Sequence, residues 1–330
     1  MLPGSNDSNP ISLPGVTAEQ FRHYLLAISC RPGDDNYSTF ATRYGRGEYQ
    51  DEWLQHVYTL HVDILTLGRL FGMANLEKWA SSMLCSVFMN VNRHKTVTRF
   101  ASQHWSADAL FHLRNLSRNT YLEQPVVTFI QYFISISLRD VTHPSNSTNS
   151  LNAHACIDLY DIVKHPGVDP VLLGCIFLNL LSLGHRSRIW SEHVTRRDRA
   201  ILYAAQVQFI DVTTELQNLG WLSLDSPIMK LVGCSFLCNA CETKLTASWR
   251  KSFGEIGQGL GSGQQLKDVS LLSQLAKNRW DFYEGWKDIC CQACETRGWL
   301  RLPSNLIDFL NDNIQTLYED VASRCGELAE

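Results

Sequence analysis

The chain has 330 residues, enough for two or three compact units, and its composition of 45% hydrophobic and 19% charged residues excludes a disordered protein. The formal net charge of −4 argues against broad binding to nucleic acids or anionic membranes, because that binding needs an excess of basic residues. No stretch reaches the roughly 18 apolar residues that cross a bilayer, and residues 1–15 lack the pattern of a secretory signal. We therefore expect a cytoplasmic or nuclear protein with mostly reduced cysteines.

The first ninety residues predict one short strand followed by helices. Ile11–Leu13 alternates in polarity and is expected to form the strand. Thr17, with a glutamine three residues later, has the pattern of a capping box and predicts the start of a helix. Apolar residues at helical spacing then predict two further helices over 57–71 and 76–87, with Gly72 as a left-handed cap between them.

The middle of the chain predicts more helices. Two are expected between residues 105 and 138, and the second contains the apolar run 126–136 behind Pro125. That run is rich in β-branched and aromatic residues, so a strand is an open alternative there. Asp169, followed by a proline, predicts the start of a nearly all-apolar helix that ends at Leu183 and lies at the centre of a core.

The last third also predicts helices. Ser226 begins one that carries several cysteines, Gly254–Gly263 is expected to be a loop, and two helices over about 266–294 and 303–323 close the chain. The predicted fold is mainly α, a multi-helix array with one or two short strands near the N-terminus. The expected domains are an N-terminal unit at 1–92, a helical region at 93–222 and a second helical region at 223–330.

One helix pair carries a family resemblance. It reads Ile64-Leu-Thr-Leu-Gly-Arg-Leu-Phe-Gly-Met-Ala-Asn-Leu-Glu-Lys-Trp-Ala80. This resembles the end of a BTB/POZ domain, where a helix with Leu-x-x-Ala-x-x-Tyr-x-Met leads into x-x-Leu-x-x-x-Cys. Gly68 stands for the alanine, Phe71 for the tyrosine and Ala80 for the cysteine. Residues 11–28 are similar to the preceding strand and helix in fungal members, and the nearest likeness is to basidiomycete BTB-domain proteins.

The resemblance covers residues 11 to about 90 and implies an interaction module. It implies a BTB/POZ-type adaptor without catalytic activity, which binds other proteins; one role in that family is the presentation of substrates to a cullin ubiquitin ligase. The chain begins too late to contain the N-terminal half of such a domain, so family-type dimerisation is not expected to carry over. The alternative interpretation of residues 56–88 is a two-helix hairpin of any α-helical protein.

Two related cysteine motifs predict a metal site. Cys238-Asn-Ala-Cys241 is followed by Glu-Thr-Lys, and Cys291-Gln-Ala-Cys294 is followed by Glu-Thr-Arg. Two Cys-x-x-Cys pairs can supply four thiolates to one structural zinc ion. This supports a second hypothesis, a zinc-stabilised regulatory protein that acts on transcription or chromatin. The alternative is that these cysteines are buried hydrophobic residues on helices.

Motifs of known enzymes are missing from the sequence. Gly254–Gly263 has no Gly-Lys-Ser/Thr and does not follow a strand, so it is not predicted to bind phosphate. There is no His-Glu-x-x-His or Gly-x-Ser-x-Gly, and the histidines are scattered. Basic residues between His185 and Arg199 are interpreted as a solvated helix start, with an acidic partner as the alternative. We predict no catalytic residues.

Overall fold

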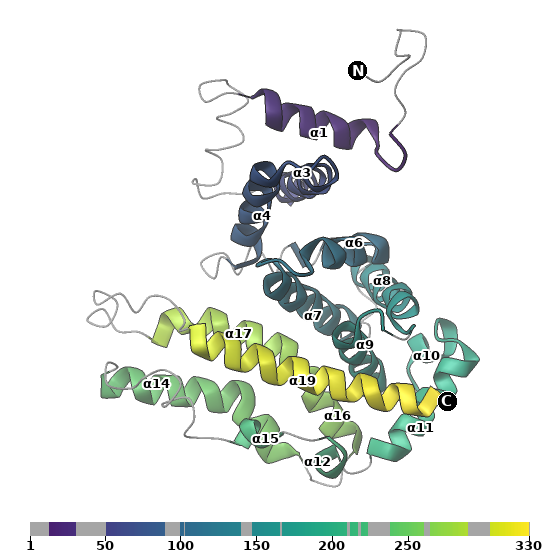
Figure 1. Cartoon of the computed structure of the whole chain (residues 1–330). Helices are drawn as coiled ribbons and strands as arrows, with labels where there is room; N and C mark the ends of the chain where they lie inside the picture. Colours follow the sequence, from purple (N-terminus) through teal and green to yellow (C-terminus); the bar gives the residue numbers. More distant parts are fainter. Residues whose placement is uncertain are drawn as a thin grey trace. The chain divides into compact units, whose positions relative to one another are not determined.

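The computed structural model describes helices and the turns between them. It describes residues 13–30, 51–89, 100–101, 103–139, 147–165, 167–209, 212–216, 219–223, 238–260, 265–289 and 304–329. In chain order the helices are α1 (Ala18–Ser29), α3 (Asp51–Leu70), α4 (Ala74–Met89), α6 (Ala107–Ser117), α7 (Glu123–Arg139), α8 (Ser147–Val163), α9 (Pro170–Leu183), α10 (Arg188–Glu192), α11 (Arg196–Gln208), α12 (Val212–Glu215), the 3₁₀-helix η5 (Leu219–Ser223), α14 (Asn239–Trp249), the π-helix η6 (Arg250–Gly254), α15 (Glu255–Gly259), α16 (Gln265–Ser273), α17 (Leu275–Ile289) and α19 (Ser304–Ala329) (Figure 1).

The prediction of a mainly α fold is confirmed, because these ranges contain helices and no strand. The short N-terminal strand is not supported. Leu13 is not in a strand, and Ile11 and Ser12 lie outside the described residues. Within the part of the chain that is described, no helix is both long enough and apolar enough to cross a membrane.

By its contacts the chain divides into two compact units, residues 1–89 and 90–330. The division lies close to the predicted boundary after residue 92. The other predicted boundary, between residues 222 and 223, falls within η5, and η5 packs against α15. The three-part division remains a prediction.

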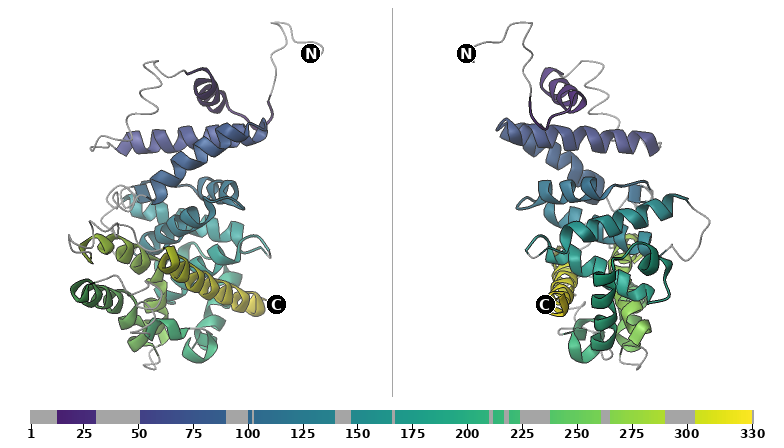
Figure 2. Two further views of the ribbon diagram at one scale, coloured as in Figure 1. Left: turned by 60° about the vertical axis from the view of Figure 1, so that its left-hand side comes forward. Right: turned by 90° about the vertical axis from the view of Figure 1, so that its right-hand side faces the viewer.

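The first unit begins with a capped helix. Thr17 accepts a hydrogen bond from the backbone N–H of Gln20 at 3.2 Å, and the Gln20 side chain accepts one from the backbone N–H of Thr17 at 2.9 Å. These two bonds satisfy N–H groups that have no partner inside a helix. The predicted capping box is therefore confirmed. The helix it begins, α1, packs against α3, and Figure 2 shows α4 leaving the end of α3 at an angle.

The second unit is built around α9. Asp169 caps this helix by accepting a hydrogen bond from the backbone N–H of Leu172 at 3.1 Å, and Pro170 occupies its first position. Gly184 ends it with a φ of 72°. Its neighbours are α7, α8, α16 and α19, so its apolar side chains are covered on several sides. The predicted central helix and its bounds are confirmed.

The contact between α9 and α19 is unusually close. A Cβ atom added to Gly174 would lie 1.8 Å from the carbonyl oxygen of Tyr318. Only glycine allows this approach of the two backbones. Figure 1 shows α19, in yellow, passing α9. The last described helix therefore covers the central one directly.

The apolar run 126–136 forms a helix, which decides between the two alternatives. It belongs to α7, with Pro125 in the first turn, where a missing backbone N–H costs no hydrogen bond. Residues 125–135 are all buried. An element buried on every side shows no clear periodicity, so its sequence does not distinguish helix from strand.

The predicted loop at Gly254–Gly263 is wrong in its first half. Residues 250–254 form a π-helix and residues 255–259 form α15, whereas residues 261–263 lie outside the described ranges. Phe253 and Ile256 are buried, and the ring of Phe253 lies 4.7 Å from that of Trp249. Burial of these side chains offsets the low helix propensity of the glycines at positions 254, 257 and 259.

The two closing helices are present with different bounds. The expected helix at 266–294 is divided into α16 and α17 at Gln274, and residues 290–294 lie outside the described ranges. The expected helix at 303–323 is α19, which continues to Ala329. Its buried stripe continues from Val321 to Cys325, beyond the predicted end at residue 323, which explains the extension of the helix.

Candidate functional site

The first cysteine pair lies at the start of α14. Cys238 is the N-cap residue, with extended backbone and an exposed side chain, and Cys241 is buried in the first turn. Their sulfurs are 3.4 Å apart. Two thiolates on one zinc ion, with Zn–S bonds of about 2.3 Å, lie about 3.8 Å apart. The pair therefore has a spacing close to that of two ligands of one ion.

The second cysteine pair cannot be placed beside the first. Cys291 and Cys294 lie outside the described residues, and no group of three or more potential metal ligands occurs in the ranges described. The alternative prediction, that these cysteines are buried hydrophobic residues on helices, is wrong for Cys238. This residue is exposed and precedes α14 instead of lying on the apolar stripe of the helix. Zinc binding by these four cysteines remains a prediction.

The junction between Gly68 and Ala80, on which the family resemblance was predicted, contains a tight turn between α3 and α4. Gly72 has a φ of 67°. The backbone N–H of Met73 donates to the carbonyl of Gly68 at 2.7 Å, and that of Gly72 donates to the carbonyl of Arg69 at 3.2 Å. These are the two hydrogen bonds of a Schellman motif. A Cβ on Gly68 would lie 3.3 Å from the backbone nitrogen of Glu77, so the small residue lets the two helices approach.

Helix α1 is attached to this hairpin by buried polar contacts. The imidazole Nδ1 of His23 lies 2.7 Å from a carboxylate oxygen of Asp63 on α3, and both residues are buried. The hydroxyl of Tyr24 donates to the sulfur of Met73 at 2.7 Å, and its ring lies 5.1 Å from that of Phe71. The residues that end α3 thus contact α1 as well as α4.

Exposed apolar side chains are concentrated on α1 and at the α3–α4 turn, which the hydrogen bond from Tyr24 to Met73 connects. Leu25 and Ile28 are exposed on α1. Leu70, Phe71 and Met73 are exposed at the α3–α4 turn, and Leu70 has 60% of its surface accessible. Several large apolar side chains exposed on neighbouring elements are typical of surfaces that bind other proteins. We refer to these five residues as the α1–turn surface.

Comparisons with protein-family models, curated proteins and solved structures find no match to this chain. The family resemblance therefore rests on the residues of α1, α3 and α4 alone. Their order along the chain and the glycines of the turn are the features that carry it.

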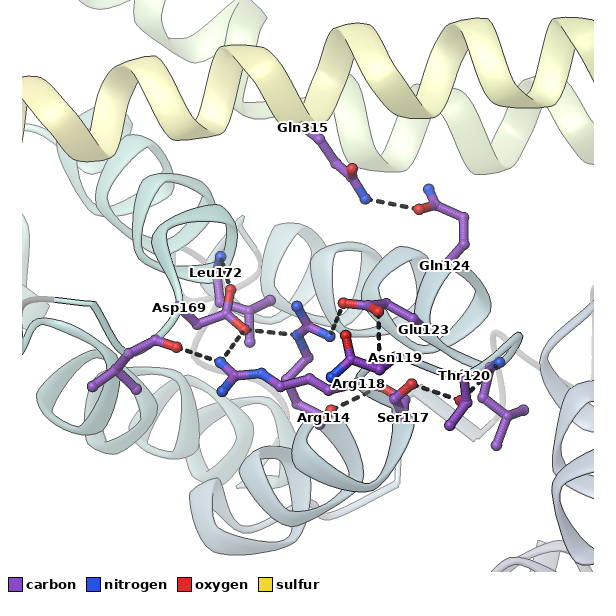
Figure 3. A network of polar contacts seen from close by, with 12 residues as sticks. Arg114, Ser117, Arg118, Asn119, Thr120, Glu123, Gln124, Asp169, Leu172 and Gln315 are labelled. Atoms are coloured by element: carbon purple, nitrogen blue, oxygen red, sulfur yellow. Dashed lines mark hydrogen bonds and ion pairs between the residues drawn. The ribbon is translucent and has the colours of Figure 1, made fainter. Parts of the chain in front are cut away.

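An ionic network in the second unit joins three helices (Figure 3). Asp169 accepts hydrogen bonds from Arg114 Nε at 2.7 Å and from Arg118 Nη2 at 3.1 Å. Glu123 accepts from Arg114 Nη1 at 2.8 Å and from the backbone N–H of Asn119. Partial burial raises the pKa of Glu123, but these hydrogen bonds outweigh burial and lower it overall. Two cations face two carboxylates, which indicates a structural role.

A second buried polar group surrounds Arg279 on α17. Its guanidinium donates to the side-chain carbonyls of Gln131 at 2.7 Å and Asn311 at 3.0 Å, and burial lowers its pKa. Burial also raises the pKa of Cys175 to about 12 and that of Tyr318 well above its usual value. A thiol with such a pKa is protonated near neutral pH and is a poor nucleophile.

The histidines are less scattered than the sequence suggests. The Nε2 atoms of His154 and His193 lie 3.1 Å apart, although 39 positions separate the two residues. Sequence reasoning treated His154 as isolated and missed this pair. No short motif indicates it, because the two residues are distant in the sequence and only the folded chain brings their imidazoles together.

Proposed function

We propose that the chain is a non-catalytic, BTB/POZ-type adaptor that binds a protein partner through the α1–turn surface. The observation that carries this proposal is the concentration of exposed apolar side chains at the BTB-like turn. The turn itself is held by the glycines at positions 68 and 72, so its side chains are displayed on a rigid support.

The binding mechanism is burial of this surface. Fully burying a large apolar side chain is worth about 1.5–3 kcal/mol, so side chains that are about half exposed contribute about 1 kcal/mol each. Leu70 is the most exposed of the five and would contribute most. A cluster of this kind acts as the central anchor of an interface, and the polar residues around it exclude water.

The partner that the resemblance suggests is a cullin scaffold, to which the chain would present a substrate for ubiquitin transfer. The test is a binding measurement between the purified chain and a purified cullin N-terminal region. We expect saturable binding that Leu70→Glu weakens at least about tenfold, equivalent to about 1.4 kcal/mol.

Val207→Glu is the matched control. Val207 is 68% exposed on α11, in the other unit, so this variant adds the same charge at a comparably exposed apolar position. Both variants should keep the circular dichroism spectrum and melting temperature of the wild type. Absence of binding by the wild-type chain, or equal binding by both variants, would contradict the proposal.

A second candidate function is a zinc-stabilised regulator of transcription or chromatin. It is favoured by the 3.4 Å separation of the sulfurs of Cys238 and Cys241. Metal analysis of the purified chain should then find one zinc per molecule, which is lost when Cys238 and Cys291 are replaced by serine. A folded protein purified without zinc would contradict this function.

A further inference from the structure

Arginine side chains are concentrated at the starts of α10 and α11 in the second unit. Residues 184–208 contain five arginines, two acidic residues and no lysine, in a chain whose formal net charge is −4. Arg186, Arg188 and Arg196 are exposed, and Arg199 is partly exposed. The segment therefore displays positive charge on a protein that is acidic as a whole.

The two acidic residues of the segment do little to neutralise these four arginines. Asp198 is buried, and its carboxylate accepts a hydrogen bond from the ammonium group of Lys164 at 3.1 Å. Glu192 lies 3.8 Å from Arg188, at the limit of an ion pair, and both side chains are more than half exposed. An exposed pair of this kind contributes little energy. Within the described ranges, the positive charge of the four arginines is therefore largely uncompensated.

The position of two of these arginines is unfavourable for the folded chain alone. Arg196 is the first residue of α11, at the end of the helix that carries a partial positive charge. Arg199 lies three residues later, so the two like charges are neighbours on one side of the helix. A carboxylate bound between them would relieve both repulsions.

An exposed aromatic ring connects the two groups of arginines. Tyr203 follows Arg199 by four residues, on the same face of α11, and has 49% of its surface accessible. Its ring lies 6.4 Å from that of His185, on the loop before α10, and 5.5 Å from that of the buried Trp190. The loop before α10 thus lies beside the arginine-bearing face of α11. We refer to Arg186, Arg188, Arg196, Arg199 and Tyr203 as the arginine surface.

We propose that the arginine surface binds an acidic segment of a partner protein, with consecutive aspartate or glutamate side chains. The planar guanidinium group donates two parallel hydrogen bonds to one carboxylate, which an ammonium group cannot do. Arginine and tyrosine are also enriched at protein interfaces, whereas lysine is depleted there. A nucleic acid is a poorer match, because its phosphates extend beyond this surface and meet a chain of net negative charge. These residues belong to the second unit, so binding here does not involve the α1–turn surface.

The test is the fluorescence anisotropy of a labelled peptide of consecutive glutamates, titrated with the purified full chain. We expect saturable binding that weakens as the salt concentration rises from about 50 to 200 mM, because salt screens exposed charges. The double variant Arg186→Gln/Arg196→Gln should bind the peptide at least about fivefold more weakly. The control Arg22→Gln/Lys251→Gln removes two other exposed positive charges and should stay within about twofold of the wild type.

Two further measurements separate lost contacts from lost structure and distinguish the classes of partner. The variant Arg186→Gln/Arg196→Gln should melt at the wild-type temperature or above it, because loss of Arg196 relieves repulsion at the start of α11. A single-stranded oligouridine of the same length should bind more weakly than the glutamate peptide. No binding of the peptide, equal binding by this variant and the wild type, or tighter binding of oligouridine would overturn the proposal.

Discussion

Replacing Gly174 by alanine tests the contact at the centre of the second unit. The added Cβ would lie 1.8 Å from the carbonyl oxygen of Tyr318, whereas ordinary contacts begin at 3.4 Å. The helices α9 and α19 would have to separate by the difference, about 1.6 Å, along this line. A backbone carbonyl cannot turn away as a side chain can, so the whole helix must move.

The energetic cost follows from the packing that this movement disrupts. A gap of 0.5–1 Å already removes about a quarter to a half of the dispersion energy of each contact across it. Overpacking of cores typically costs about 1–3 kcal/mol, and a clash with backbone lies at or beyond the upper end. We therefore expect Gly174→Ala to lower the free energy of unfolding by about 3 kcal/mol or more.

Urea unfolding followed by circular dichroism measures this loss. With a slope of about 2–3 kcal/mol per molar urea, the midpoint should fall by about 1 M or more. Gly326→Ala is the control, because Gly326 lies on α19 with no atom within 4 Å of the added Cβ. It should stabilise the chain by up to about 1 kcal/mol through helix propensity. A loss below about 1 kcal/mol for Gly174→Ala would refute the close crossing of α9 and α19.

Three further substitutions test other contacts. Asp169→Ala leaves the buried Arg114 with only the partly exposed Glu123 as ion-pair partner and removes the cap of α9, so it should cost about 3 kcal/mol in urea unfolding; a cost within 1 kcal/mol would exclude the ionic network. The pKa of Glu123 in the folded chain is lower than its usual value of 4.5. Ionised Glu123 therefore stabilises the fold above pH 4.5, and this stabilisation is lost as the pH falls through the lower pKa of the folded chain. Glu123→Gln should therefore reduce the loss of stability on acidification, and an unchanged acid unfolding curve would contradict this. Thr17→Ala should cost about 1 kcal/mol, seen as roughly fivefold faster hydrogen exchange of α1 amides; unchanged exchange would exclude the capping box.

Features set by neighbouring residues were predictable from the sequence. The cap at Thr17, the left-handed glycine at position 72 and the start of α9 at Asp169 each depend on contacts within about five residues. Their chemistry is specific enough to be read directly. The all-α class followed from the same local patterns.

Features set by distant contacts were not predictable. The glycine-rich stretch after Phe253 forms helix because aromatic residues from separate elements bury it, and local propensity points the other way. The α1–turn surface is visible only when exposure is known, since Leu70 continues the apolar pattern of α3. The contact of His154 with His193 joins residues 39 positions apart, for which the sequence has no short signal.

The position of α9 along the chain has a consequence for biosynthesis. This helix is apolar on nearly all sides, and the helix that crosses it at Gly174 begins 120 residues after α9 ends. At about 5–20 residues per second, a ribosome needs roughly 6–24 s to synthesise the intervening chain. During that time α7 and α8, which are made earlier, can cover part of α9, whereas the side that α19 covers is still open. We therefore expect the exposed side of α9 to be the segment of the nascent chain that most needs shielding until α19 emerges.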